Sequence, residues 1–287
     1  MDRLNIAAPQ AFLIEPLVRA ALAEDLGRAG DLTTDTIVPK DARVRGLLNA
    51  RKAGVVAGLG VATIAFRLLD PDAQIEVACA DGTTVGANRP IATVSGRARA
   101  LLTAERVALN FLCHLSGVAT ATREIVDAVA GYPARIACTR KTTPGLRALE
   151  KYAVRLGGGV NHRFGLDDGV LLKDNHIVVA GGIRAAIEKA KASLGHMVKV
   201  EVEVDHIDQL GAALAAGADA ILLDNMTPAQ MREAVAIVDG GAIVEASGRI
   251  TAETAAEIAA TGVDVISCGW ITHSAPILDI GLDFEPI

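Results

Sequence analysis

Short apolar runs alternate with longer amphipathic stretches along the second half of the chain. Six of these runs have the length and aliphatic composition of buried strands, and they cover residues 135–139, 170–173, 198–204, 220–224, 242–247 and 263–268. Between the later runs, apolar residues recur at the spacing of one helix face. Strands that alternate with Ala-rich helices predict a parallel sheet covered by helices.

Capping signals set the limits of the helices expected between these strands. Thr227-Pro228 and Thr251 are suited to helix starts, because threonine caps the first turn and proline fits the first helical position. Glycines are typical helix ends, and the chain places them at Gly217, Gly240 and Gly262. Six strands are too few for a complete eight-stranded barrel, so the pattern favours an open irregular barrel or a doubly wound sheet.

The first half has the mixed pattern of an α+β domain. Strand-like runs are followed by two adjacent helices; the runs lie at 45–58 and 75–94, and the helices at 101–115 and 117–131. Asp81-Gly82 has the composition of a hairpin turn. We expect the boundary between the two domains near Ser116-Gly117.

Composition narrows the class of protein. Of the 287 residues, 51% are hydrophobic and 22% are charged, which permits a sizeable core and argues against global disorder. We expect no transmembrane helix, since no apolar run is long enough to span a bilayer, and no signal peptide, since Pro9, Glu15 and Pro16 interrupt the first segment.

Charge and cysteine usage restrict the compartment and the partners. The four cysteines, Cys79, Cys113, Cys138 and Cys268, are far apart in apolar surroundings, which indicates reduced, buried thiols in a cytoplasmic protein. A net charge of −6 argues against nucleic-acid binding. Any anion site must therefore be a local concentration of positive charge.

Such a concentration follows the first two strands. Segment 139–176 holds seven Lys or Arg and four Asp or Glu. Ligands of parallel β/α folds bind at the carboxyl ends of the strands, so residues there are candidates for an anion site: Arg140, Lys141, Arg163 and Lys173. For Arg147, Lys151 and Arg155 we prefer a solvated helix face.

The middle strands end in acidic residues. Glu203 and Asp224 terminate neighbouring strands, and carboxylates beside a bound phosphate usually hold Mg²⁺ or sugar hydroxyls. The alternative for each is an isolated charge at a strand exit. Glu201 would face the same side as Glu203, deeper in its strand, and there it would need a partner.

The last two strands end in small residues. Ser247-Gly248 and Gly269 precede expected helices, where backbone N–H groups can bind a phosphate. These strand ends together predict a site for a polyanionic small molecule. A zinc site made by His162 and His176 with Asp168 or Asp174 is disfavoured, because it lacks helical spacing and a cysteine ligand.

Long ordered motifs are similar to one known family. They include EDLGRAGDLTTDTIVP, TAERVALNFLCHLSGVAT, TRKTTPGLR, NHRFGLDDGVLLKDNH, LLDNM and EASG. Through them nearly the whole chain resembles quinolinate phosphoribosyltransferase, the decarboxylating enzyme of NAD biosynthesis. The resemblance implies an α/β sandwich domain over 1–116, joined by 275–287, and an open irregular α/β barrel of about seven strands over 117–274.

The resemblance also implies roles for single residues. The quinolinate-binding residues would be Thr139, Arg140, His162, Arg163 and Lys173, completed by Arg106 of a neighbouring subunit. Without the family, Arg106 would be an exposed charge on a helix that begins at Thr103. The residues around phosphoribosyl pyrophosphate would be Lys141, Glu203, Asp224, Ser247, Gly248, Gly269 and His273. Among these, Lys141, Glu203 and Asp224 are the catalytic candidates, although Lys141 is also placed to contact a quinolinate carboxylate.

The implied cofactor is Mg²⁺, held by Glu203 and Asp224, and the implied assembly is a homodimer or larger homo-oligomer with shared active sites. Two alternatives stay open: a paralogue associated with molybdenum transport, and a non-enzymatic anion-binding barrel. Two positions depart from the family pattern. Arg249 stands where a second glycine is common, and Trp270 where a small residue is common.

Overall fold

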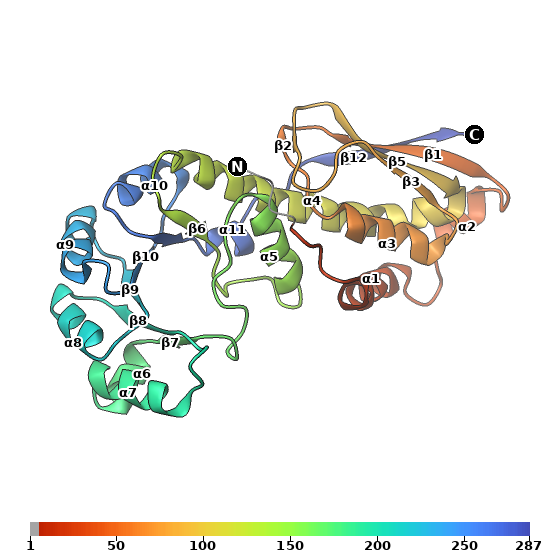
Figure 1. Ribbon diagram of the computed structural model, residues 1–287. Helices are drawn as coiled ribbons and strands as arrows, with labels where there is room; N and C mark the ends of the chain where they lie inside the picture. Colours follow the sequence, from red (N-terminus) through yellow and green to blue (C-terminus); the bar gives the residue numbers. More distant parts are fainter. Residues whose placement is uncertain (1–5) are drawn as a thin grey trace. The chain divides into compact units, whose positions relative to one another are not determined.

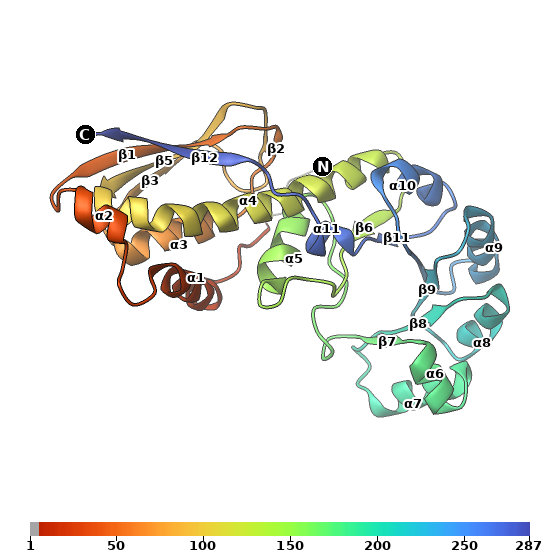
Figure 2. The same cartoon turned by 180° about the vertical axis from the view of Figure 1, so that it is seen from behind.

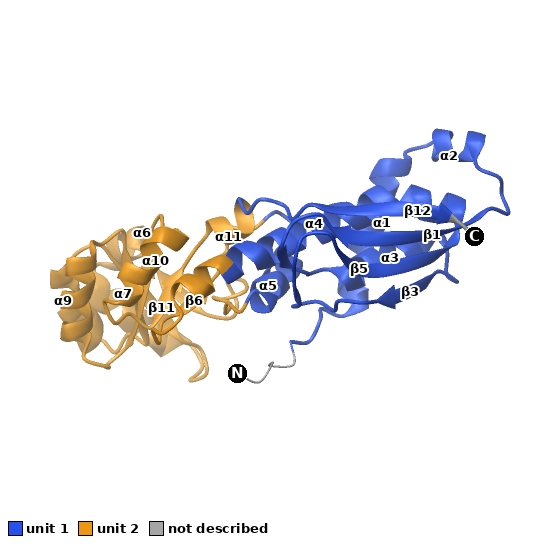
Figure 3. Ribbon diagram, turned by 90° about the horizontal axis from the view of Figure 1, so that it is seen from above, with its two compact units in different colours: residues 1–123, 143–157, 274–287 blue, residues 124–142, 158–273 orange. Residues whose placement is uncertain are grey.

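The chain forms two compact units, which Figure 3 distinguishes by colour. The computed structural model describes residues 6–287. The first five residues of the segment in which we expect no signal peptide lie outside this range. One unit holds the chain up to Arg123 together with 143–157 and 274–287, and the other holds 124–142 and 158–273.

An antiparallel sheet organises the first unit, in the strand order β12-β1-β5-β3. Its strands are β1 (Arg43–Ala50), β3 (Gln74–Val77), β5 (Arg89–Arg97) and β12 (Ile280–Pro286). In β1, Gly46, Leu48 and Ala50 are buried, and they alternate with more exposed residues, as expected for a strand with one face on a core. The C-terminal strand β12 pairs with β1.

Helices cover this sheet on one side, as Figures 1 and 2 show. The unit contains α1 (Ala11–Leu26), α2 (Leu32–Ile37), α3 (Leu59–Leu69), most of α4 (Ala98–Ala128) and α5 (Arg147–Leu156). A small second ladder joins β2 (Gly54–Val55) to β4 (Thr84–Val85).

The expected hairpin at Asp81-Gly82 is wrong. A turn does occur, with Gly82 at φ +83°, but β3 pairs with β5 while β4 pairs with β2. The Asp81 carboxylate accepts hydrogen bonds from the backbone N–H groups of Gly58 and Leu59, at 3.1 and 3.0 Å. This aspartate therefore caps the start of α3 instead of closing a hairpin.

The two helices expected around Ser116-Gly117 are one continuous helix, α4. Gly117 does not break it. A Cβ at this position would collide with the carbonyl oxygen of Pro276, so the glycine permits close backbone approach. Thr103 lies inside α4 rather than at its start, and its hydroxyl donates to Asp31 at 2.9 Å.

The second unit contains all six strands expected from the sequence. They are β6 (Arg135–Ala137), β7 (Val170–Leu172), β8 (Val200–Val204), β9 (Ala220–Asp224), β10 (Ile243–Ser247) and β11 (Val265–Ser267), parallel and in the order β6-β11-β10-β9-β8-β7. A parallel bridge between Ala137 and Val160 adds a short seventh segment beside β6. No ladder among the described residues joins this edge to β7, so the predicted open irregular barrel is confirmed.

Helices lie along the outer face of this barrel (Figure 1). The helices of this unit are α6 (Asp174–Ala180), α7 (Ile183–Ser193), η1 (Ile207–Gln209), α8 (Leu210–Ala215), α9 (Pro228–Val238), α10 (Ala252–Ala259) and α11 (Trp270–His273), and the last of them follows β11 at the carboxyl ends of the strands. Thr227 caps α9 as expected, since its side chain accepts from the Gln230 N–H. No helix in the described part of the chain has the length and apolar character needed to cross a membrane.

Candidate active site

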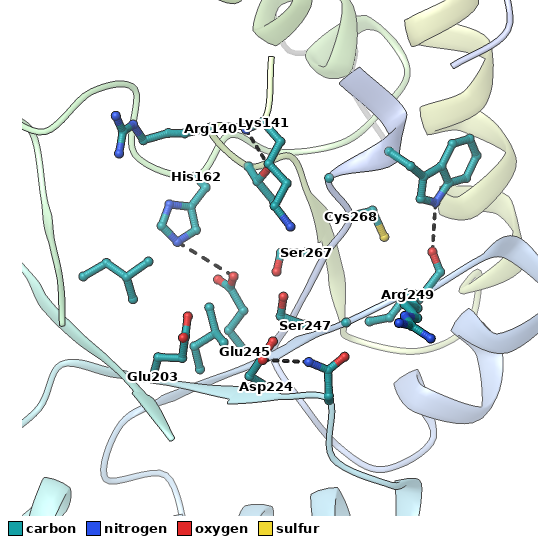
Figure 4. Close-up of a pocket in the computed structure, with 18 of the residues that line it drawn as sticks. Arg140, Lys141, His162, Glu203, Asp224, Glu245, Ser247, Arg249, Ser267 and Cys268 are labelled. Atoms are coloured by element: carbon teal, nitrogen blue, oxygen red, sulfur yellow. Dashed lines mark hydrogen bonds and ion pairs between the residues drawn. The ribbon is translucent and has the colours of Figure 1, made fainter. Parts of the chain in front are cut away.

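The carboxyl ends of the barrel strands surround a cavity of about 760 Å³, shown in Figure 4. Such a volume suits a small-molecule ligand. Every site residue predicted from the sequence lines this cavity, except Arg106: Thr139, Arg140, Lys141, His162, Arg163, Lys173, Glu203, Asp224, Ser247, Gly248, Gly269 and His273.

Strand register explains why these residues converge. β8, β9 and β10 run in parallel, with Glu203 opposite Leu222 and Asp224 opposite Ser247. Because side chains alternate between the two faces of a strand, these residues share the inner face. On the other face, Ile221 and Leu223 are fully buried beneath the outer helices.

Two arginines give one end of the cavity its positive charge. The Nε atoms of Arg140 and Arg163 are buried and have no hydrogen-bond acceptor within the described protein. Arg163 also donates from Nη1 to the Gly169 carbonyl at 2.9 Å, which fixes the guanidinium. Burial, followed by the charge of Arg140, lowers the pKa of Arg163. Buried donors without acceptors fit an anionic ligand such as a carboxylate.

The loop before β7 is held by Asp168. Its carboxylate accepts from the backbone N–H groups of Phe164 and Gly165, the second at 2.8 Å. At the far end of the same stretch, the backbone N–H of Lys173 donates to Nδ1 of His176 at 3.0 Å. His176 therefore supports the start of α6, and the two histidines do not form the zinc site considered from the sequence.

His162 is held at both ring nitrogens. Its Nδ1 accepts from the backbone N–H of Arg163 at 2.8 Å, so the ring hydrogen lies on Nε2. Nε2 is 2.8 Å from Oε2 of Glu201 and donates to it. Glu201 thus has the partner that its depth in β8 requires.

The acidic pair lies between the two ends of the cavity. Lys173 Nζ forms an ion pair with Glu203 Oε2, and Asp224 Oδ2 accepts from the Asn225 side chain at 2.7 Å. Carboxylate oxygens on adjacent strands are the hard donors that Mg²⁺ prefers, so the chemistry of this pair fits the ion.

Tight backbone turns form the opposite end. Gly248 has φ +117°, and a Cβ there would collide with the side-chain oxygen of Asn225. A Cβ on Gly269 would lie 2.9 Å from Lys141 Cδ and 3.6 Å from His273 Nε2. Gly248 is therefore required by its backbone conformation and by close approach, whereas a Cβ at Gly269 would displace the Lys141 side chain.

The two departures from the family pattern have structural explanations. Arg249 lies in the left-handed region at φ +40°, which is the conformation that glycine favours. Trp270 donates from Nε1 to the Ile250 carbonyl at 2.9 Å and so ties this turn to α11. Both side chains line the cavity.

Sequence reasoning missed one buried acid, Glu245, which lines the cavity from β10. A signal for it exists in the chain. Glu245 precedes Ser247 by two residues, just as Glu201 precedes Glu203, so it shares the inner face.

Arg106 lies elsewhere in the chain, on α4 of the first unit, where it is exposed. It borders a separate cavity of about 400 Å³ together with Asp25, Asp31 and Thr103. Its predicted contact with quinolinate stays a prediction.

Comparisons with known proteins agree with this architecture. A family model of the quinolinate phosphoribosyl transferase N-terminal domain matches residues 31–116, and one of the C-terminal domain matches 118–283. The nicotinate-nucleotide pyrophosphorylase (carboxylating) of Mycobacterium leprae is 46% identical over 271 residues, which cover 93% of this chain and 95% of that protein. A Bacillus subtilis relative, named as a probable enzyme of the same kind, is 44% identical over 94% of this chain and 93% of its own length.

Solved structures extend the similarity to the fold. The crystal structure of NadC from Streptococcus pyogenes aligns with a TM-score of 0.94 at 39% identity, and the alignment covers 98% of this chain and 99% of that one. The chain is therefore similar to these proteins in both sequence and fold over nearly its whole length.

Proposed function

Because the chain belongs to the quinolinate phosphoribosyltransferase family, we propose that it joins quinolinate to phosphoribosyl pyrophosphate, with loss of CO₂. The products are nicotinate mononucleotide, pyrophosphate and CO₂. The observation that carries the proposal is the cavity itself, in which buried arginine donors, a carboxylate pair and glycine turns succeed one another.

The arginine end suits quinolinate, a planar dicarboxylate. Arg140 and Arg163 offer buried Nε–H donors, and guanidinium groups bind carboxylates through paired hydrogen bonds. Lys173, Thr139 and His162 complete this end. Fixing both carboxylates orients the ring nitrogen toward the ribose, so the attack becomes effectively intramolecular.

The carboxylate pair suits the ribose. Glu203 and Asp224 would hold its hydroxyl groups and stabilise the positive charge that develops on the sugar as the pyrophosphate departs. The same two residues would hold Mg²⁺, which when bound supplies charge neutralisation for the pyrophosphate. Lys141 would contact the diphosphate from the opposite wall.

The glycine end suits the 5-phosphate. Ser247, Gly248 and Gly269 would offer N–H and hydroxyl donors, and His273 follows on α11. The backbone N–H groups there carry no charge, so they can bind a phosphate without competing with the cations at the other end.

The reaction needs no covalent enzyme intermediate. The electron pair of the ring nitrogen forms the bond to C1 of the ribose as the bond to pyrophosphate breaks. The carboxylate at ring position 2 then leaves as CO₂, and its bonding electrons stay on C2 beside the positively charged nitrogen. A proton from solvent completes the product.

The assembly and the compartment belong to the same proposal. We infer a homodimer or larger homo-oligomer in which Arg106 of a neighbouring subunit reaches quinolinate, and a cytoplasmic location. Arg106 is exposed on α4, as such a role requires. The four cysteines are buried thiols that form no disulfide bond, which fits a reducing compartment.

The direct test is product analysis. Purified protein with quinolinate, phosphoribosyl pyrophosphate and Mg²⁺ should form nicotinate mononucleotide, and Arg140→Ala protein should form far less. Nicotinate mononucleotide should be undetectable if the protein is instead a molybdenum-associated paralogue or an anion-binding barrel. Absence of product from folded protein would therefore contradict the proposal.

A further inference from the structure

Three side chains form a cluster beside the cavity, which His162 and Glu245 line. They are His162, Glu201 of β8 and Glu245 of β10, and one polar atom of each lies within 4.8 Å of the others. His162 Nε2 is 2.8 Å from Glu201 Oε2 and 3.8 Å from Glu245 Oε1. Figure 4 shows the Glu245 carboxylate directed toward the imidazole.

Hydrogen bonding fixes the protonation of His162. Its Nδ1 accepts from the backbone N–H of Arg163, so a hydrogen on Nδ1 would face another donor. The ring is therefore neutral, with its hydrogen on Nε2 directed at Glu201. This arrangement also opposes a metal ion in the cluster, because a metal ligand needs a bare Nε2 and a hydrogen-bonded Nδ1–H.

Glu245 then needs a proton. Its Oε1 is buried and has no hydrogen-bond partner in the described protein, and the residue is only 5% exposed. A neutral imidazole provides no full positive charge, while Glu201 provides a negative charge nearby. Two ionised carboxylates this close in a buried site repel each other strongly.

Burial and Glu201 raise the pKa of Glu245, and they outweigh the groups that lower it, among them Ser267. Burial, followed by the charge of Glu201, raises the pKa of Glu245 to about 7 even when a charged His162 opposes the shift, and a neutral ring removes that opposition. Cys268 follows β11, and burial together with Glu245 raises its pKa to about 12, so it stays uncharged. Ser267 of β11 is a neutral hydrogen-bond partner. The charge of Arg163 interacts with the carboxylates of Glu201 and Asp168.

We propose that Glu245 and Glu201 are positioning residues that hold His162 in one neutral tautomer and keep this cluster at a single negative charge. The inference rests on the proposed function, since it concerns the end of the cavity assigned to quinolinate. A proton on Glu245 leaves the field of Arg140 and Arg163 available to a dianionic substrate. Loss of that proton would place a second negative charge beside the same substrate.

The pH dependence of quinolinate binding tests the inference. Glu245 is neutral below about pH 7 and ionised above it, so the KM for quinolinate of the wild-type protein should rise at least about threefold between pH 6.5 and 8.5. The kcat should change by less. In Glu245→Gln protein, which cannot ionise at this position, the KM should be flat with pH. The same rise in Glu245→Gln protein as in wild type would overturn the inference.

Two further variants make the test specific. Glu201→Gln removes the charge that raises the Glu245 pKa, so the rise in KM should begin at a lower pH; an unchanged onset would contradict the pairing. Glu233→Gln, on the exposed surface of α9, should behave as wild type. Far-ultraviolet circular dichroism would confirm that each variant is folded.

A measurement without substrate separates this inference from the proposed function. Long-range ¹H–¹⁵N spectra of histidine-labelled free protein should show His162 as the Nε2–H tautomer throughout pH 6–8, with the resonance assigned by its loss in His162→Asn protein. An imidazolium signal, an Nδ1–H tautomer or a shift on addition of Zn²⁺ would overturn the inference. An inactive protein with the expected His162 spectrum would contradict only the proposed function.

Discussion

At the scale of single residues, the phosphate end of the cavity depends on positions that only glycine fills easily. Gly248 combines a left-handed backbone with a neighbour, Asn225, that leaves no room for a Cβ. The next residue, Arg249, is also left-handed, so two successive residues bend the chain back over the cavity. The shape of this turn directs its backbone N–H groups.

Gly248→Ala should therefore weaken binding of phosphoribosyl pyrophosphate. The left-handed backbone should cost about 1–2 kcal/mol, and the collision with Asn225 should move the turn as well. We expect a rise of at least about tenfold in the KM for phosphoribosyl pyrophosphate, equivalent to about 1.4 kcal/mol. Steady-state kinetics at saturating quinolinate would measure it.

Gly240→Ala is the matched control for this change. Gly240 has φ +73°, but a Cβ at this position would have no neighbouring atom within 4 Å, and the residue does not line the cavity. Gly240→Ala should lose about as much stability as Gly248→Ala, but its KM for phosphoribosyl pyrophosphate should not change. Equal KM values in the two variants would show that the turn at Gly248 has no role in substrate binding.

The sequence predicted that most of these candidate residues converge because one physical rule covers them. Side chains at the carboxyl ends of parallel strands meet at one edge, so Arg140, Lys173, Glu203 and Asp224 could be placed together from strand order alone. This rule does not cover Glu245, because it lies inside its strand. The role of a polar residue there can be assigned only when its neighbours are known. Only the structure shows that Glu245 lies beside His162 and Glu201.

At the scale of elements, the short helix α11 connects separate loops of the site. The Thr272 hydroxyl donates to the Lys141 carbonyl at 2.7 Å, and the residue is 1% exposed. Trp270 in the same helix bonds the carbonyl of Ile250. Through these two bonds, α11 fixes the backbone after β6 and the backbone after β10.

Thr272→Val should disturb the site through this connection. It keeps the shape of the side chain but leaves the Lys141 carbonyl without its donor, which should cost about 1–3 kcal/mol of unfolding free energy. Because Lys141 would be held less firmly, we also expect kcat to fall several-fold. Urea unfolding and steady-state kinetics would measure the two effects. Thr272→Ser retains the hydroxyl and should keep most of the stability and most of the kcat. A Thr272→Val protein with unchanged stability and kcat would contradict this role for α11.

The prediction of strands and helices from the sequence was correct where one periodic pattern of apolar residues was clear. All six barrel strands and the capped start of α9 follow from local pattern. The sequence failed at α4 and at Asp81-Gly82, where distant partners decide the outcome. The local pattern at Gly117 predicts a helix break, but the glycine is explained by the close approach of Pro276. The pattern at Asp81 predicts a hairpin, but its side chain caps α3.

At the scale of the whole molecule, the three arginines assigned to quinolinate do not all lie in the same compact unit of the chain. Arg106 belongs to the first unit and Arg140 to the second. In a homodimer with shared active sites, each site would take Arg140 from one subunit and Arg106 from its partner.

Mixed variants test this sharing. Arg106→Ala and Arg140→Ala proteins should each be nearly inactive alone. After subunit exchange at equal amounts, half of the dimers are hybrids with one intact site in two, so about a quarter of wild-type activity should return. Arg140→Ala mixed with Arg163→Ala is the matched control, since both residues line the same cavity and no intact site can form. No return of activity in the first mixture, despite verified exchange, would contradict a shared site.

The stoichiometry of the reaction with quinolinate decides whether the protein is the proposed transferase. Protein supplied with quinolinate labelled in its 2-carboxyl group, phosphoribosyl pyrophosphate and Mg²⁺ should release labelled CO₂, pyrophosphate and nicotinate mononucleotide in equal amounts. Nicotinate, which lacks the 2-carboxylate and so offers the arginine end only one of the two carboxylates of quinolinate, should react far more slowly. Release of pyrophosphate without CO₂, or equal rates with the two pyridines, would contradict the account.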